Sequence, residues 1–158
     1  LGLDKRIEFY VSDFPRSKIG GVFDLVVLSE VLEHIPDDKK ALEFAKGVLR
    51  QGGVILVSVP LADAPLKRVG LLEAFDKRVG HLRRYKEDEI LGLIRGTGLK
   101  IIYKGRFEGI LRNSLFTNRF LGLSIKFIGG FLSDFISLLD NLSLSVFGAS
   151  QMIIVAKK

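Results

Sequence analysis

The pattern of apolar and polar residues predicts a strand, a helix and a second strand over residues 25–59. The apolar run 25–28 has the length and β-branched content of a strand buried on both faces. Helical spacing follows over residues 38–50, and the pair Gly52-Gly53 suits the left-handed end of that helix. A second apolar run covers residues 54–59. This order predicts one βαβ crossover with parallel strands.

Weaker patterns extend the prediction on both sides. Residues 5–11 alternate imperfectly and predict a strand, while residues 86–95 are amphipathic and predict a helix. The apolar runs 99–103 and 152–156 predict two further strands. These elements together predict an α/β fold, with residues 1–158 as a single domain that is long enough to bury a substantial core.

Residues 107–150 are the least regular part of the chain. Apolar residues between positions 127 and 146 follow helical spacing, but charged residues interrupt them too often for a membrane-spanning helix of about 20 apolar residues. A helix that is apolar nearly all round is buried or lies against an apolar partner. One interpretation is that this segment forms a helix packed on the sheet edge, with its outer surface facing a partner. The other is a membrane surface, because Arg112, Arg119 and Lys126 recur every seventh residue and suit anionic headgroups.

A polar cluster follows the first apolar run. At helical spacing Glu30, Glu33 and His34 stand at i, i+3 and i+4, and would project from one face. The carboxyl end of a strand in an open parallel sheet is where ligands bind. Two carboxylates and an imidazole could bind a divalent cation or supply a general base. The alternative is a short turn, in which the acids favour a helix start and His34 bonds locally.

The connection over residues 61–86 is basic, with seven lysines and arginines against three acidic residues. Loops in this position often cover a ligand site. Because the planar fork of arginine fits phosphate or carboxylate, an anionic acceptor is one interpretation. Solvated charges, with Tyr85 packing at a helix start, are the other.

Composition narrows the possible functions and kinds of site further. The chain has no cysteine, which excludes disulfides, a thiolate nucleophile and cysteine-ligated metal. The formal net charge of +6 suits an anionic partner or a solvated basic surface. Nucleic acid is disfavoured, because the phenylalanines stand among leucines and isoleucines rather than between basic residues. We expect a cytoplasmic protein, peripheral to a membrane if residues 107–150 meet lipid.

Two segments carry a family resemblance. The run FDLVVLSEVLEHIPDDKKALEFAKGVLRQGGVILVSVP resembles the central part of the class I S-adenosylmethionine-dependent methyltransferases, and GHLRRYKEDEILGLIRGTGLKI resembles their next segment. The resemblance implies a Rossmann-like sheet, mostly parallel, with an antiparallel edge hairpin and residues 107–150 as a helical insertion between its two strands. The family's first strand and glycine-rich turn have no counterpart before Leu1. We therefore expect the C-terminal portion of a methyltransferase domain, with the N-terminal strands missing.

The resemblance also implies how the cofactor, S-adenosylmethionine, is bound. Asp13 stands where the family has an acidic residue that binds the adenine amino group, and Phe14 could pack on the ring. Ser29 and Glu30 would line the methionine side. The alternative for Asp13 is a turn before Pro15, since aspartate favours turns without any ligand.

The acceptor side follows in the same way. His81, Arg84 and Tyr85 lie in the segment that folds over the acceptor pocket in the family. His34 is the first candidate for the general base and His81 the second. Some similar quinone-pathway and small-RNA methyltransferases bind a metal at the positions of Glu30, Glu33 and His34, whereas many other relatives carry these residues without one, so a metal is a weak expectation.

The predicted function is methyl transfer from S-adenosylmethionine to a small or lipid-linked acceptor, at oxygen. The competing prediction is a binding module without catalysis, at a membrane surface or on nucleic acid. We also expect the 158-residue chain alone to bind S-adenosylmethionine weakly or not at all, and to be inactive.

Overall fold

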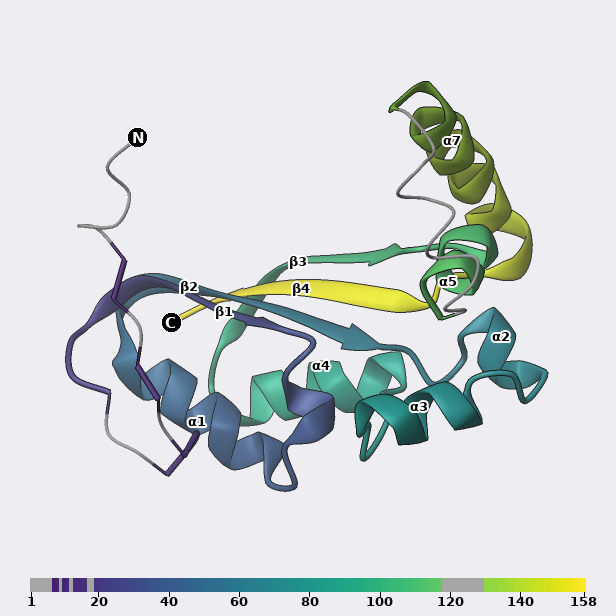
Figure 1. Ribbon diagram of the computed structural model, residues 1–158. Helices are drawn as coiled ribbons and strands as arrows, with labels where there is room; N and C mark the ends of the chain where they lie inside the picture. Colours follow the sequence, from purple (N-terminus) through teal and green to yellow (C-terminus); the bar gives the residue numbers. More distant parts are fainter. Residues whose placement is uncertain (1–6, 9, 12, 17–18, 118–129) are drawn as a thin grey trace.

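The computed structural model describes residues 7, 8, 10, 11, 13–16, 19–117 and 130–158, and builds one four-stranded sheet with helices against it (Figure 1). The strand order is β1-β2-β4-β3. β1 and β2 pair in parallel, and β4 runs antiparallel to both β2 and β3. The predicted α/β class and the antiparallel edge hairpin are confirmed. The strands are β1 (Phe23–Ser29), β2 (Leu49–Pro60), β3 (Lys100–Phe107) and β4 (Gln151–Lys157).

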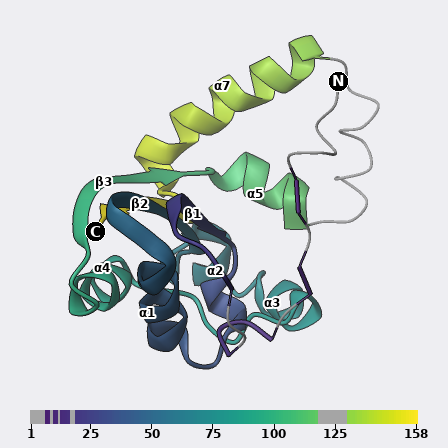
Figure 2. The ribbon, with the colours of Figure 1, turned by 90° about the vertical axis from the view of Figure 1, so that its left-hand side faces the viewer.

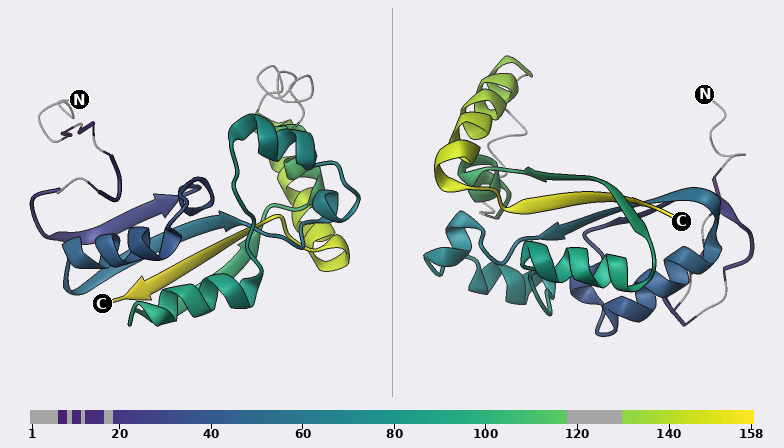
Figure 3. Two further views of the ribbon diagram at one scale, coloured as in Figure 1. Left: turned by 90° about the horizontal axis from the view of Figure 1, so that it is seen from below. Right: turned by 180° about the vertical axis from the view of Figure 1, so that it is seen from behind.

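Two helices, α1 and α4, lie along the same face of the sheet, as the view from below in Figure 3 shows. α2 and α3 lie beyond the carboxyl end of β2, and α5 and α7 lie on the other side of the sheet at that same end (Figure 1). The helical elements are the 3-10 turn η1 (Leu32–His34), α1 (Asp38–Val48), α2 (Pro65–Arg68), α3 (Glu73–Val79), α4 (Glu87–Gly96), α5 (Ile110–Thr117) and α7 (Gly130–Phe147).

The core lies between the sheet and the helices α1 and α4. Alternate residues of a strand point to opposite faces, and one set of alternate positions in β2 and β4 is completely buried. Leu42 of α1 and Ile90 and Ile94 of α4 close over this layer. The buried strand residues are Ile55, Val57, Val59, Met152, Ile154 and Ala156.

The opposite face of β1 is bare within the described part of the chain. Leu25 and Val27 are 54% and 53% exposed, whereas Leu28 on the helix side is buried. The prediction of a strand buried on both faces was therefore wrong for β1. Its apolar run indicated burial, but β1 is the edge strand here, and no described element covers its second face.

The first crossover differs from its prediction at the end of α1. Asp37 caps the helix start by accepting a hydrogen bond from Lys40 N at 3.0 Å. The helix then ends at Val48, and the glycine pair lies inside β2. The register shifts there, from Phe23↔Leu49 to Leu25↔Val54. Gly53 suits this irregularity because a Cβ would stand 2.9 Å from Arg50 O.

The strand predicted over residues 5–11 was wrong for the residues that the structure describes. Ile7, Glu8, Tyr10 and Val11 belong to no strand, and Val11 is fully exposed. Residues 5, 6 and 9 lie outside the described part. The described residues of this segment pair with none of the strands β1 to β4.

α5 and α7 follow β3 and precede β4, and they pack on each other. The view in Figure 2 shows α7 extending away from the sheet. Among the described helices, none is long and apolar enough to cross a membrane. Arg119 and Lys126 of the predicted basic series lie outside the described residues.

We predict that Ile55→Ala lowers the free energy of unfolding by about 3 kcal/mol, because it leaves a cavity in the fully buried layer of β2. Ile102→Ala is the matched control. Ile102 is 53% exposed on β3, so we expect a loss within about 0.5 kcal/mol. Urea unfolding followed by circular dichroism measures both. Equal losses for the two variants would contradict the placement of the core.

Candidate functional site

Polar side chains meet where β1 and β2 end and β4 begins. Ser29 Oγ lies 3.0 Å from Ser58 Oγ, which donates to Glu30 Oε1 at 2.9 Å. Gln151 Nε2 donates to Glu30 Oε2 at 3.0 Å. The carboxylate of Glu30 therefore lies across the end of the sheet. The structure places Ser29 and Glu30 in one hydrogen-bonded group with Ser58 and Gln151, which the sequence did not single out.

Glu30 adopts a left-handed backbone conformation with φ of 52°. This conformation is uncommon for a residue with a side chain. It separates Glu30 from the 3-10 turn that follows, so Glu30, Glu33 and His34 do not continue one helical face. The predicted one-face arrangement was wrong because the chain turns at Glu30 before the helical segment begins.

Glu33 is the most deeply buried acidic residue of this region. Its side chain is 0% exposed, and neither carboxylate oxygen has a hydrogen-bond partner among the described residues. Two imidazoles face the same oxygen. Glu33 Oε1 lies 3.8 Å from His34 Nε2 and 3.9 Å from His81 Nε2. The two rings are also in contact edge to face, with centroids 4.9 Å apart.

The other nitrogen of each imidazole has an acceptor beside it. His34 Nδ1 lies 3.1 Å from the carbonyl oxygen of Gly80, which can only accept, so Nδ1 carries the hydrogen. His81 Nδ1 lies 3.0 Å from Asp76 Oδ1 and donates to that carboxylate. When the rings are neutral, both Nε2 atoms therefore carry a lone pair and lie within 4 Å of Glu33 Oε1.

An ion pair between Asp76 and Arg84 positions His81. Arg84 Nη2 donates to Asp76 Oδ1 at 2.7 Å, and Nε donates to Oδ2 at 2.8 Å. Burial alone would raise the pKa of Asp76, but the hydrogen bonds and charge of Arg84 and His81 outweigh burial and lower it. Asp76 is thus a carboxylate that accepts from His81 Nδ1 and fixes the orientation of the ring.

The end of α3 explains how His81 returns to Asp76. Gly80 has φ of 83°, a left-handed conformation that favours glycine, and it ends the helix. The amides of Gly80 and His81 both donate to Asp76 O, each at 2.9 Å. The chain reverses there and places the imidazole against the Asp76 side chain. Sequence reasoning missed Asp76; the glycine after Lys77-Arg78-Val79 was the available signal.

Burial shifts the acid–base balance of the cluster toward neutrality. It raises the pKa of Glu33 to about 7, and the nearby charge of Glu30 adds to this effect. Burial also lowers the pKa of His81, although the hydrogen bond to Asp76 opposes this change. The cluster can therefore exchange a proton near neutral pH, which general acid–base chemistry requires.

The same three side chains could hold a divalent cation. One ligand atom from each of Glu33, His34 and His81 lies within 4.8 Å of the others. Three protein ligands of this kind leave a coordination position open. Glu30, predicted as a weak ligand, is bonded to Ser58 and Gln151 instead.

Two predicted acceptor residues have internal partners. Tyr85 is 4% exposed, and its hydroxyl donates to Asp38 Oδ2 at 2.8 Å and approaches Leu32 O at 3.2 Å. Burial and Asp38 hold the pKa of this hydroxyl well above its usual range. The guanidinium of Arg84 is 6% exposed in its pair with Asp76. Both residues support the cluster rather than open toward a ligand.

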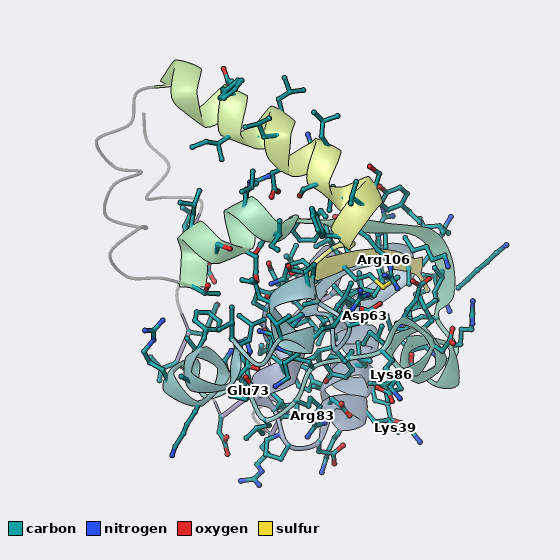
Figure 4. The ribbon with its side chains drawn as sticks, turned by 90° about the vertical axis from the view of Figure 1, so that its right-hand side faces the viewer. Lys39, Asp63, Glu73, Arg83, Lys86 and Arg106 are labelled. Atoms are coloured by element: carbon teal, nitrogen blue, oxygen red, sulfur yellow. The ribbon has the colours of Figure 1, made fainter. Side chains whose placement is uncertain are left out.

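Much of the basic connection is also paired. Figure 4 shows Asp63 close to Arg106, below α7, and Glu73 and Arg83 lower in the molecule. The carboxylates reduce the charge available to an anionic ligand. The pairs within the connection and with its neighbours are Lys67–Glu73, Arg68–Asp63, Arg83–Asp38, Arg84–Asp76 and Arg106–Asp63.

Asp13 and Phe14 lie beside α1, away from the strand ends. The Phe14 ring packs edge-on against Phe44 of α1, with centroids 5.3 Å apart, in an apolar groove of about 450 Å³ along β1. Asp13 O accepts from Arg16 N at 2.6 Å, which forms the turn expected as the alternative. The structure does not bring these two residues to Ser29 and Glu30.

Sequence comparison identifies the family. A family described as "Methyltransferase domain" matches residues 8–104, well over half of the chain. The chain belongs to this methyltransferase domain family. No curated protein matches the chain in sequence.

Solved structures show the same fold in other methyltransferases. An S-adenosylmethionine-dependent methyltransferase from Archaeoglobus fulgidus is 15% identical, with a TM-score of 0.56, over 87% of this chain and 60% of its own. The N-methyltransferase NodS from Bradyrhizobium japonicum, solved with S-adenosylhomocysteine, is 13% identical, with a TM-score of 0.54, over 98% and 57%. An O-methyltransferase family 2 protein from Planctomyces limnophilus, solved with apigenin, is 18% identical, with a TM-score of 0.60, over 99% and 37%.

The TM-scores establish likeness of fold, and the low identities carry no more than that. This chain spans at most about three fifths of the length of each of these proteins. Its Rossmann-like sheet, with an antiparallel edge, matches theirs.

We predict that Glu33→Gln removes a pH dependence of stability. The pKa of Glu33 is about 7 in the folded chain, against 4.5 as its ordinary value, so its stabilising effect is complete below pH 4.5 and lost as pH rises through 7. Between pH 5 and 8 the wild type should lose about 2–3 kcal/mol relative to the variant. Urea unfolding with a chelator present measures this difference. Glu43→Gln, at an exposed position of α1, is the control, and a parallel pH course of wild type and Glu33→Gln would contradict the burial.

Proposed function

We propose that the protein containing this chain transfers a methyl group from S-adenosylmethionine to a hydroxyl oxygen of a small or lipid-linked acceptor. Family membership supports the class of reaction. The observation that carries the proposal is the cluster of Glu33, His34 and His81 beside the carboxyl ends of β1 and β2, where ligands bind in such sheets. It offers a proton acceptor where an acceptor hydroxyl would need one.

The end of the sheet suits the cofactor. S-adenosylmethionine carries a positive sulfonium and an ammonium group, and Glu30 offers a carboxylate there. Gln151 Oε1 is buried and has no hydrogen-bond partner among the described residues. We infer that Ser29, Glu30 and Gln151 line the methionine side. Asp13 and Phe14 remain our candidates for adenine, and this role requires that they move from their place beside α1.

When bound, S-adenosylmethionine supplies an electrophilic methyl group. In the proposed mechanism His34 Nε2 takes the proton from the acceptor hydroxyl. His34 suits this task because its side chain is 37% exposed and Gly80 O fixes its hydrogen on Nδ1. Glu33 Oε1 lies 3.8 Å from this same Nε2, and the ionised form of Glu33 would stabilise the imidazolium that forms. His81 is the second candidate, since its side chain is only 8% exposed.

The base favours an oxygen acceptor, because a hydroxyl must lose its proton during attack. The apolar surface of α7 at the same end of the sheet supports a lipid-linked acceptor. An anionic acceptor has less support, because Arg83 and Arg84 each pair closely with a carboxylate. A binding module without catalysis would not need a buried carboxylate between two imidazoles.

A divalent cation is a second candidate role for the cluster. The convergent lone pairs of His34 and His81 on Glu33 favour it. The metal would polarise the acceptor hydroxyl and assist its deprotonation. Titration of the chelator-treated chain with Zn²⁺ and Mn²⁺ tests this role, and micromolar binding that Glu33→Gln abolishes is the expected result. Unchanged affinity in Glu33→Gln would rule out this site.

We predict that His34→Gln in the full-length protein lowers kcat about 100-fold or more, with the KM for S-adenosylmethionine nearly unchanged. The assay uses methyl-labelled cofactor with lipid extracts and with aqueous extracts. Lys39→Gln, exposed on α1, is the control and should keep wild-type kcat.

Each outcome of this assay bears on one part of the proposal. Loss of kcat in His81→Gln alone would transfer the role of base to His81. Label confined to water-soluble products would contradict a lipid-linked acceptor. If the full-length protein transfers no label from the cofactor to either extract, the result would favour a binding module without catalysis.

We also predict that the 158-residue chain alone binds S-adenosylmethionine more weakly than micromolar. Phe14 packs on Phe44 of α1, whereas Glu30 is bonded to Ser58 at the strand ends, so among the described residues the groups assigned to the two ends of the cofactor share no contact. Isothermal titration calorimetry measures the affinity. A dissociation constant in the micromolar range would show that the described arrangement already suffices.

A further inference from the structure

The helix α7 buries two polar residues and exposes several large apolar ones. Asp140 is 0% exposed and Ser143 is 9% exposed, both on the side that packs against α5. A surface helix normally buries its apolar stripe and exposes its polar one. The outward residues are Phe135, Leu138, Leu139, Leu142 and Val146, which are 39–74% exposed.

Polar contacts fix this orientation. Asp140 Oδ2 accepts from Gly109 N at 2.8 Å, and Oδ1 accepts from Arg112 N at 2.9 Å. The carboxylate thereby satisfies amides at the start of α5, which helix geometry leaves unpaired. Gly109 allows the close approach, since a Cβ would stand 2.6 Å from Asp140 O and collide with Ser143 Oγ. Rotating α7 to bury its leucines would leave these amides unpaired.

The spacing of the outward residues gives one continuous strip. Leu138, Leu142 and Val146 are four residues apart, and Phe135 and Leu139 lie beside them, so the strip runs along most of the described helix. Asp134 is the one charged residue that is exposed on the described α7. A contiguous apolar surface of this kind marks an interaction site.

Basic side chains border the strip. Arg112 is exposed on the first turn of α5. Arg68 is 58% exposed, and the carboxylate contact that its guanidinium makes among the described residues is a long one of 4.0 Å to Asp63. Its Nη2 lies 3.8 Å from the place of a Cβ at Gly148, just after the end of α7. With a net charge of +6, the chain is attracted to an anionic surface, whereas two copies would repel each other.

We propose that α7 docks the protein on an anionic membrane surface, with the strip inserted at the level of the headgroups and Arg68 and Arg112 facing lipid phosphates. Interfacial helices bind in this way, through buried apolar area and basic flanks. The docking does not depend on methyl transfer. If the proposed function also holds, docking brings the site at the carboxyl ends of β1 and β2 to a lipid-linked acceptor.

Flotation with vesicles of phosphatidylcholine, with or without phosphatidylglycerol, tests the proposal on the full 158-residue chain, without cofactor or acceptor. We expect binding to the anionic vesicles that falls with added salt. Leu138→Gln/Leu142→Gln should lower the partition coefficient at least about tenfold, because two leucines lose their burial. Arg68→Gln/Arg112→Gln should weaken binding to the anionic vesicles alone.

Ile102→Gln/Tyr103→Gln is the matched control. These two residues are 53% and 56% exposed on β3, outside the strip, so binding should not change. Circular dichroism confirms that each variant folds. Wild-type chain that fails to float with anionic vesicles overturns the proposal, as does equal loss in the control. A wild-type dimer in light scattering that Leu138→Gln/Leu142→Gln dissociates, without vesicle binding, would assign the strip to a second copy instead.

Discussion

Burial of one sheet face under α1 and α4 determines where the functional groups meet. The helices fix the positions of the segments that precede them, which are η1 before α1 and the connection before α4. Tyr85 joins the two, because its hydroxyl reaches both Leu32 O and Asp38 Oδ2. Glu33 and His81 therefore lie together although far apart in sequence. The cluster thus depends on the same hydrophobic layer that stabilises the sheet.

Burial of the Glu33 carboxylate in the cluster costs free energy, which the hydrophobic layer must offset. A buried carboxylate without a hydrogen bond is unfavourable when charged. Glu33 reduces this cost by keeping its proton up to near neutral pH, and the two imidazoles beside it can take that proton. An arrangement that is unfavourable for folding but suited to proton transfer is typical of functional sites.

Much of the fold could be predicted from periodicity. The runs 25–28 and 54–59, with the helix between them, gave the parallel crossover because each pattern is local. Burial of β1 could not be predicted, since an apolar strand looks the same whether or not a neighbour covers it. Leu25 and Val27 show this, because their side chains match a buried strand yet stand half exposed.

The sequence predicted which residues belong to the site better than it predicted how they are arranged. Glu33 and His34 were visible as adjacent polar residues after a strand, and His81 through family resemblance. The turn at Glu30 depends on one backbone angle, and the contact of Asp76 with Arg84 depends on the path of a long connection. Neither leaves a periodic signal. The buried polar side of α7 could not be predicted for a similar reason. In the sequence Asp140 interrupts an apolar helix, whereas in the structure it accepts hydrogen bonds from amides at the start of α5.

Gly80 connects both imidazoles through the backbone alone. Its carbonyl sets the tautomer of His34, while its left-handed conformation turns the chain so that His81 meets Asp76. Any side chain at this position would strain the turn and disturb both rings together. A substitution at Gly80 would therefore affect both histidines at once, through a backbone group that takes no part in the proposed chemistry.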